Sequence, residues 1–155
     1  MSESPALSLD GFLPYRLSVL SNAVSSKIAK IYEQEFELSI WQWRIMAVLG
    51  EHQGLTSTEV AQRTLMDKPT VSRAAASLIE RGILERKIDR DDRRRAPMRL
   101  TDEGNAIYAA ILPRAIESER ELLDALSEEE AATLHGLLSR LSAVVSPDKP
   151  LWGDD

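Results

Sequence analysis

Five polar residues divide most of the chain into α-helices. Ser39, Thr56 and Ser127 are each followed three residues later by Gln or Glu, which is the pattern of a capping box at a helix N-terminus. Asp67 and Thr101 belong to the residue types that cap helices on their own. After each cap, apolar side chains recur every three or four residues, as on one face of a helix. We predict helices over residues 12–36, 40–51, 57–64, 68–81, 102–122 and 128–145.

The helical spacing is interrupted once, directly after Gly82, a residue type that commonly follows a helix end. Two short stretches, Ile83–Ile88 and Ala96–Leu100, are typical of β-strands. They are joined by Asp89–Arg95, in which every residue is charged. We therefore predict a mainly α fold with one small β-hairpin, the wing. All 155 residues form a single domain, because no linker interrupts the chain.

The composition excludes several classes of protein. The chain has no cysteine, which excludes disulfides, thiolate nucleophiles and cysteine zinc sites. Its two histidines, His52 and His135, lie far apart and have no obvious partner as metal ligands. We find no pairing of a nucleophile with a base and no phosphate-binding glycine loop. We therefore expect no enzyme activity, no catalytic residue, no metal and no cofactor.

The sequence also lacks the patterns of membrane insertion and secretion. No apolar stretch approaches the roughly 18 residues that a transmembrane helix needs. Residues 1–10 carry no positive charge before their apolar positions, unlike a signal peptide. We expect a cytoplasmic protein that does not bind membranes.

The net charge of −6 is distributed unevenly. Residues 63–99 contain 11 Lys and Arg against 6 Asp and Glu, a local charge of +5, whereas the rest of the chain carries −11. A basic region on an acidic body is the electrostatic pattern of a phosphate-binding surface. A solvated charged face would give the same count, so the count alone does not decide between them.

The predicted helices 57–64 and 68–81 are separated only by a tight turn at Leu65–Met66, which is typical of a helix-turn-helix. In that motif the second helix enters the DNA major groove with its N-terminal residues towards the bases. An ordinary amphipathic surface helix is the alternative. The exposed hydrogen-bonding side chains expected at this end are Lys68, Thr70, Ser72 and Arg73, with Ser77 one turn further on.

Arginines crowd the tip of the predicted wing, at Arg90, Arg93, Arg94 and Arg95. Arginine on a narrow two-stranded wing can enter the minor groove, where negative potential is concentrated. Asp92 is placed to hold a neighbouring guanidinium in a bidentate pair. A charged loop is often merely solvated, but its position directly after a helix-turn-helix favours DNA contact.

Four segments together resemble the MarR family of bacterial winged-helix regulators: Asp67–Arg73, Leu78–Gly82, Asp92–Arg94 and Leu100–Gly104. The resemblance covers about residues 12–145. It implies a winged helix-turn-helix DNA-binding lobe over residues 39–101, with dimerisation helices at 12–36 and 102–146. It also implies an obligate homodimer that binds a palindromic operator in double-stranded DNA, usually as a repressor. The apolar faces of the first and the last two helices, which the small lobe could not cover, independently favour pairing.

On the same resemblance, Asp92 corresponds to the aspartate that orients the family's minor-groove arginine, here Arg94. The residues that fall where the family contacts bases and phosphates are Lys68, Pro69, Thr70, Ser72 and Arg73. The additional arginines at positions 90, 93 and 95 leave open which one enters the groove.

The family usually binds a small anionic or aromatic effector between the dimer helices and the winged lobe. Candidate effector residues here are Arg16, as a carboxylate partner, with Trp43 and Arg44. Each has a simpler explanation: Arg16 pairs locally, Trp43 packs in the core, and Arg44 pairs with a nearby acid. The segments Phe12–Leu17 and Trp41–Arg44 resemble members that govern breakdown of aromatic acids, so we expect an aromatic acid or aryl thioester. Without cysteine, the thiol-oxidation branch of the family is excluded.

The leading interpretation is a repressor that such an effector releases from its operator. Activation instead of repression is left open. A sequence-independent, architectural DNA-binding protein is the second hypothesis, and it predicts equal affinity for every duplex with a steep loss in salt.

Overall fold

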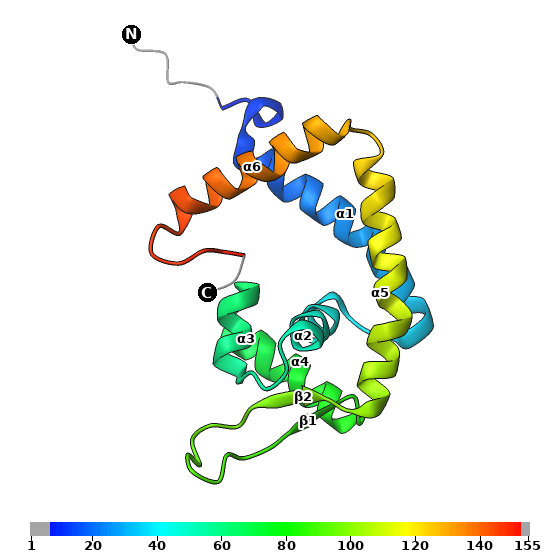
Figure 1. The fold of residues 1–155 in the computed structure, drawn as a ribbon, viewed down its shortest axis with the longest axis vertical. Helices are drawn as coiled ribbons and strands as arrows, with labels where there is room; N and C mark the ends of the chain where they lie inside the picture. Colours follow the sequence, from blue (N-terminus) through cyan, green and yellow to red (C-terminus); the bar gives the residue numbers. More distant parts are fainter. Residues whose placement is uncertain (1–6, 153–155) are drawn as a thin grey trace.

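The computed structural model describes residues 7–152, and expectations for residues 1–6 and 153–155 lie outside this range. The fold is mainly helical with one two-stranded antiparallel sheet, as predicted. The elements in chain order are the 3-10 turn η1 (Leu9–Gly11), α1 (Leu13–Phe36), α2 (Ile40–Glu51), α3 (Ser57–Thr64), α4 (Lys68–Glu80), β1 (Leu84–Arg86), β2 (Met98–Leu100), α5 (Asp102–Leu123) and α6 (Glu128–Val145) (Figure 1).

All five predicted helix caps are confirmed. Oγ of Ser39 accepts the backbone N–H of Gln42 at 3.2 Å. In return, Oε1 of Gln42 accepts the backbone N–H of Ser39 at 2.8 Å. Thr56 and Ser127 open α3 and α6 with the same reciprocal pair. Asp67 and Thr101 each accept one backbone N–H at the start of α4 and α5. The local sequence therefore determines where these helices begin.

The core lies between α2, α4 and the hairpin. Ile45 and Leu49 of α2, Val71 and Leu78 of α4, and Met98 of β2 are fully buried. Complete burial of an aliphatic side chain of this size contributes about 1.5–3 kcal/mol relative to exposure. These contacts hold α4 with one side against the core and the other towards solvent.

The hairpin ladder is shorter than predicted. β1 and β2 pair antiparallel over three residues each, with Leu84 opposite Leu100. The ladder ends at Pro97 because proline has no N–H to donate. On its other edge β2 forms one bridge, between Met98 and Leu55. The base of the wing is therefore anchored to the segment between α2 and α3.

Trp41 is spaced for the same face of α2 as Ile45 and Leu49, but it does not pack in the core. Its side chain is 43% exposed, because the buried face of α2 is turned towards Met46. Trp43 is the half-buried tryptophan, and it stacks between Tyr32 of α1 and Tyr108 of α5 with ring centroids 5.7 and 6.0 Å away. The core explanation for Trp43 is therefore supported, and the stack joins α2 to both long helices.

α6 lies apart from the lobe formed by α2, α3 and α4, crossing the top of Figure 1. Its apolar stripe is uncovered in this chain, since Leu134, Leu137 and Leu141 are 40–47% exposed. Ser142 is the buried residue of this helix. α6 thus carries an apolar face without burying it against its own chain.

The apolar face predicted for residues 12–36 is divided in two. Leu13, Leu17 and Leu20 in the first half of α1 are exposed, whereas Ala29 and Tyr32 in the second half are buried. Only the second half therefore belongs to the core of this chain. Within residues 7–152, no helix has the length and apolar character required to span a membrane.

The described part of the C-terminal tail, residues 146–152, is folded back. The Ser146 hydroxyl donates to the Lys149 carbonyl oxygen. Lys149, Leu151 and Trp152 then line a cavity of about 320 Å³ together with the ends of α2 and α3. The tail up to Trp152 thus lies against the winged lobe.

Gly104, in the first turn of α5, provides a test of backbone packing. A Cβ added there would lie 2.2 Å from the carbonyl oxygen of Ile83. We predict that Gly104→Ala lowers the free energy of unfolding by about 1–3 kcal/mol, because the backbone must shift to admit the methyl group. Urea denaturation followed by circular dichroism measures it. Gly11→Ala is the control, since its Cβ would have nothing within 4 Å, and equal stability of the two variants would contradict the packing argument.

Candidate nucleic-acid interface

A chain of polar contacts at the start of α4 leads from the helix cap to an exposed arginine. Asp67 accepts the backbone N–H of Thr70 at 2.8 Å on Oδ1 and the Thr70 hydroxyl at 2.7 Å on Oδ2. The Thr70 Oγ1 accepts a 3.5 Å bond from the Arg73 guanidinium. The bonds from the Thr70 hydroxyl and N–H hold the pKa of Asp67 below its ordinary value, and the charge of Arg73 adds to this effect. The first turn of α4 is thereby a fixed platform.

The structure places the predicted base- and phosphate-contacting residues on the solvent side of this platform. Lys68, Pro69, Ser72 and Arg73 are exposed, and Thr70 is half-buried. The opposite side of the helix is apolar and packs on the core. The exposed end thus combines short hydrogen-bonding side chains with two cations, which suits close approach to base edges and phosphates.

Ser77 requires a correction. It is half-buried, and its Oγ accepts a 3.0 Å hydrogen bond from Nε2 of Gln42. Gln42 also closes the capping box of α2, so one amide joins the start of α2 to α4. The Ser77 hydroxyl therefore serves helix packing, and it was wrong to group it with the exposed side chains.

The turn between α3 and α4 is held by backbone geometry and a buried anchor. Leu65 has φ of 53°, in the left-handed region, while Met66 next to it is buried. The Thr64 hydroxyl donates to the Val60 carbonyl at 2.8 Å and accepts the Met66 N–H at 3.3 Å. A left-handed leucine costs roughly 1–2 kcal/mol, which these contacts offset. The tight turn predicted between the two helices is confirmed.

Two aspartates shape the tip of the wing through the backbone. Oδ1 of Asp89 accepts the N–H of Asp91 at 2.9 Å, and Oδ1 of Asp92 accepts the N–H of Arg94 at 3.0 Å. The ion pairs within residues 7–152 include none between Asp92 and an arginine. The expected bidentate pair is therefore not formed. Asp92 instead fixes the turn that carries Arg94.

Arg95 differs from the other wing arginines, since its guanidinium lies 3.6 Å from the carboxylate of Glu59 on α3. Glu59 also accepts the Thr56 N–H at 2.7 Å, and this bond chiefly lowers the pKa of Glu59, with the Arg95 charge contributing. Nearer the base of the wing, Arg86 donates to the Ser57 hydroxyl at 3.2 Å. The wing is thus attached twice to the start of α3. The other tip arginines, at 90, 93 and 94, are exposed.

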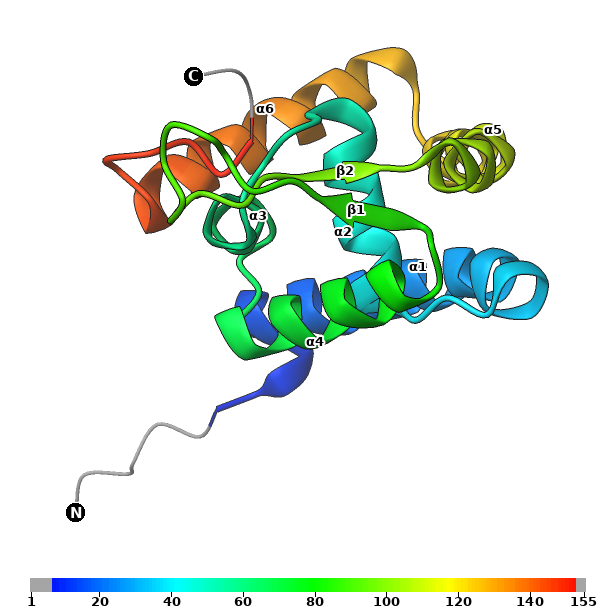
Figure 2. The ribbon, with the colours of Figure 1, turned by 90° about the horizontal axis from the view of Figure 1, so that it is seen from below.

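The N-terminal end of α4 and the tip of the wing reach the same side of the molecule, at the left of Figure 2. These two parts carry the exposed cations Lys68 and Arg73 of α4 and the wing arginines at 90, 93 and 94, on a chain with a net charge of −6. A narrow helix end with a cationic wing matches the geometry by which winged helices contact both grooves of a duplex.

Comparison with known proteins agrees with this geometry. Residues 36–95 match the model described as MarR family. Over 144 residues the chain is 28% identical to the HTH-type transcriptional regulator PecS of Dickeya dadantii, covering 90% of this chain and 86% of PecS. The chain belongs to the MarR family.

Solved MarR structures share the whole architecture. A MarR/EmrR family transcriptional regulator from Acinetobacter sp. ADP1 superimposes with a TM-score of 0.83 at 28% identity, covering 91% of this chain and 99% of that one. MepR of S. aureus, in its complex with DNA, gives a TM-score of 0.77 at 28% identity and covers 84% of this chain and 96% of MepR. This MarR protein is a DNA-binding transcriptional regulator with a winged-helix fold.

The three candidate effector residues of this MarR protein do not meet within one chain. Trp43 lies in the aromatic stack beside Tyr32, and the Arg44 guanidinium lies 5.4 Å from the ring centroid of Trp41. Arg16 is exposed near the start of α1, sixteen residues before Tyr32, or about 24 Å along the helix axis. Arg16 therefore cannot share a small ligand with Trp43 of the same chain.

Sequence reasoning missed the long-range contacts that attach the wing to the helices. Gln53 accepts the Leu100 N–H at 3.1 Å and donates to Asn105 at 3.5 Å, which joins the end of α2 to β2 and α5. The partners lie 47 and 52 positions away in the chain. No local pattern signals such pairs, and the only local signal is a glutamine two residues beyond the end of α2.

The Asp67 cap predicts a dependence of stability on pH. Because its pKa is lowered by folding, its contribution is present above the ordinary value of 3.8 and is lost as the pH falls through the folded value. Asp67→Asn retains a capping oxygen but does not titrate. We predict that the free energy of unfolding falls less steeply in this variant than in the wild type between about pH 5 and about pH 2.

Urea denaturation across this pH range measures the two slopes. Glu80→Gln is the control. It removes a carboxylate from the same helix, and within residues 7–152 this carboxylate accepts no hydrogen bond. It should follow the wild-type slope. Identical slopes for the wild type and Asp67→Asn would contradict the role of the cap.

Proposed function

We propose that this MarR protein is a homodimer that represses transcription by binding a palindromic operator, and that a small aromatic acid or aryl thioester releases it. The observation that carries the proposal is the meeting of the polar end of α4 and the arginine wing on one side of an acidic molecule. A phosphate backbone attracts that side and is repelled by the rest.

The uncovered apolar helices support the homodimer, with residues 12–36 and 102–146 as the dimerisation helices. Large contiguous apolar patches on a protein surface usually mark an interface. The leucines that this chain leaves 40–59% exposed on α1, α5 and α6 are Leu13, Leu17, Leu20, Leu122, Leu134, Leu137 and Leu141. A second copy offers matching faces, so twofold pairing would bury them on both chains.

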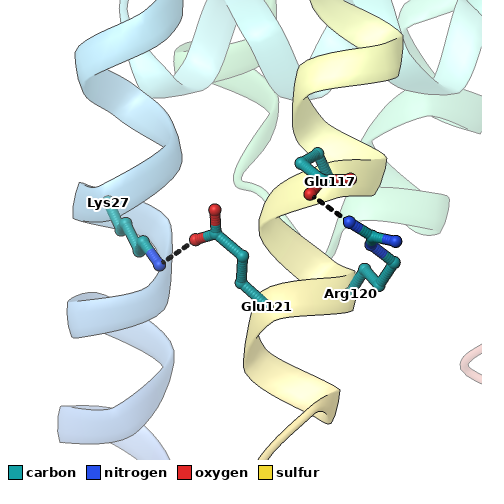
Figure 3. A network of polar contacts seen from close by, with 4 residues as sticks. All are labelled: Lys27, Glu117, Arg120 and Glu121. Carbon is teal, nitrogen blue, oxygen red and sulfur yellow. Dashed lines mark hydrogen bonds and ion pairs between the residues drawn. The ribbon is translucent and has the colours of Figure 1, made fainter.

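A groove between α1 and α5 gives the partner a place to pack. Its volume is about 440 Å³, and its apolar lining includes Val24, Ile28, Ile116 and Leu122. Lys27 of α1 pairs with Glu121 of α5 at 2.7 Å, and Glu117 pairs with Arg120 along α5 at 2.7 Å (Figure 3). The bond from Lys27 lowers the pKa of Glu121. The Lys27–Glu121 pair would form part of a polar rim around the apolar contact, whereas Arg120 lies on the side of α5 away from α1 (Figure 3).

The paired molecule would present two α4 helices about 34–36 Å apart, one turn of duplex DNA. The complex of MepR with DNA supports this mode for a chain of the same fold. We assign Arg94 to the minor groove, because Asp92 fixes its backbone while Glu59 engages Arg95. The exposed arginines at 90 and 93 would contact phosphates. The residues assigned to the major groove are Lys68, Pro69, Thr70, Ser72 and Arg73.

We place the effector between α2 and the paired helices. Burial raises the pKa of the Tyr32 hydroxyl, the charge of Arg44 acts against this, and the Arg44 guanidinium lies 5.4 Å from the ring centroid of Trp41. Arg44 and Trp43 of one chain, with Arg16 of the partner subunit, would offer two cations and a ring to an aromatic carboxylate. Release from DNA follows if the effector binds the DNA-incompetent dimer more tightly.

Arg94→Ala tests the DNA contact. Duplexes are enriched from a random pool by the wild-type protein and titrated against a scrambled duplex at several salt concentrations. We predict that the wild type prefers the enriched duplex by about 10³-fold or more. Arg94→Ala should weaken binding by about 1–3 kcal/mol with unchanged melting.

Arg120→Gln removes an arginine far from the wing and is the control, expected to bind like the wild type. Equal affinity of the wild type for the enriched and scrambled duplexes, with steep loss in salt, would favour the architectural hypothesis instead. A destabilised Arg94→Ala protein would show that Arg94 is structural.

Leu137→Glu tests the dimer. A carboxylate in the apolar stripe of α6 would be buried without a partner, so we predict monomers and at least about tenfold weaker binding to the enriched duplex. Light scattering after size exclusion measures the mass. Ala132→Glu introduces the same charge on the opposite side of α6 and should leave the dimer intact. A dimeric Leu137→Glu protein would refute this interface.

A further inference from the structure

The end of α4 that faces away from the DNA-contacting side is joined to two other helices. α4 stops in a tight turn, in which the Gly82 N–H donates to the Ile79 carbonyl at 3.0 Å and the Ile83 N–H donates to the Leu78 carbonyl at 2.9 Å. Gly82 has φ of 71°, which favours glycine. The contacts of this turn therefore help to orient α4, together with the packing of α4 on α2 and α3.

Arg81 connects the turn to α1. Its guanidinium donates to the Phe36 carbonyl at 2.7 Å and to the Glu37 carbonyl at 3.0 Å. Glu37 has φ of 51°, so α1 ends in a left-handed residue. The last carbonyls of a helix lack partners within the helix and carry the negative end of its dipole. A planar guanidinium with two donors is suited to cap them.

α5 is seated on the same turn from another side. The Thr101 hydroxyl donates to the Gly82 carbonyl at 2.6 Å, and the Thr101 N–H donates to the Ile83 carbonyl at 3.1 Å. Gly104 permits this approach, because any Cβ there would overlap the Ile83 carbonyl. α5 is thus attached through backbone packing, whereas α1 is attached through the side chain of Arg81.

We propose that Arg81 is a positioning residue that fixes the tilt of α4 relative to α1, and so selects the spacing of the two DNA half-sites. This inference rests on the proposed homodimer, in which α1 and α5 hold the partner and α4 holds DNA. Without Arg81, α4 would keep its packing on α2 and α3 and its attachment to α5, but it would lose its tie to α1.

The length of α4 makes its far end sensitive to this contact. α4 has 13 residues and is about 20 Å long. A tilt of about ten degrees at the Arg81 end moves the Lys68 end by about 3.5 Å, close to the rise of one base pair. Arg81 is itself exposed and lies outside the core, so its loss should alter spacing rather than folding.

The test compares the full-length wild type with Arg81→Met, Arg81→Lys and Arg120→Gln. Arg120 is the control, because its bond to Glu117 stays within α5. The DNA probes are the paired half-sites that the wild type enriches from a random duplex pool, the same half-sites set one base pair closer or further apart, and a duplex with a single half-site.

We expect the wild type and Arg120→Gln to share one preferred spacing. Arg81→Met should reduce the preference over the neighbouring spacings by about tenfold, with unchanged affinity for the single half-site. The spacing preference of Arg81→Lys should fall between those of the wild type and Arg81→Met, because an ammonium cannot hold both carbonyls as a guanidinium does. Hydrogen exchange without DNA should show faster exchange of the Glu37 and Leu38 amides in Arg81→Met alone.

An unchanged spacing preference in Arg81→Met would overturn the inference, as would an equal loss of affinity for all three kinds of duplex. If the wild type enriches only single half-sites, the proposed dimeric reader fails and the inference with it. In that case the exchange measurement would still show whether Arg81 holds α1 to α4, which separates the two failures.

Discussion

Gly82 and Ile83 turn the chain out of α4 with two backbone hydrogen bonds, and four elements meet at this turn. β1 begins directly after it, Thr101 and Gly104 seat α5 on it, and Arg81 ties it to the end of α1. Hydrogen bonds between backbone groups in such close packing leave little freedom for adjustment. The C-terminal end of α4 is therefore held by elements that lie outside the proposed DNA-contacting side, and its exposed N-terminal turn is free to carry polar and cationic side chains.

The chain separates its surface chemistry in the same way. Residues 63–99 carry the positive charge, while the rest of the chain is acidic and includes the helices with uncovered apolar stripes. Acidic side chains on the polar sides of α1, α5 and α6 keep these helices hydrated and repel a phosphate backbone. In the proposed binding mode, the side with α4 and the wing would attract a duplex, so the charge distribution would orient the molecule before any specific contact forms.

The parts of the structure that could be predicted from the sequence depend on residues close together in the chain. A cap needs a polar residue and a backbone N–H three positions on, so the helix starts with caps and the tight turn were predicted correctly. The wing was predicted at the right place, but its paired strands are shorter than predicted. Trp41 and Trp43 flank the buried face of α2, and only their partners in α1 and α5 decide between them. Ser77 was misplaced because Gln42, its hydrogen-bond partner, lies 35 positions away. Asp92 had two acceptable donors, a guanidinium or a backbone N–H, and turn geometry rather than composition selected the second.

The aromatic stack offers a physical route from the proposed effector site to the recognition helix. Trp43 lies between the Tyr32 ring of α1 and the Tyr108 ring of α5. Gly50 makes room for the Tyr108 ring, because a Cβ added at Gly50 would lie 2.5 Å from that ring. A ligand that separated these rings would move α1 relative to α5. Because both helices hold the C-terminal turn of α4, one through Arg81 and one through Thr101, that movement would become a tilt of α4. A hundredfold preference of the ligand for the tilted arrangement, about 2.7 kcal/mol, would then weaken DNA binding without any contact to the DNA-facing residues.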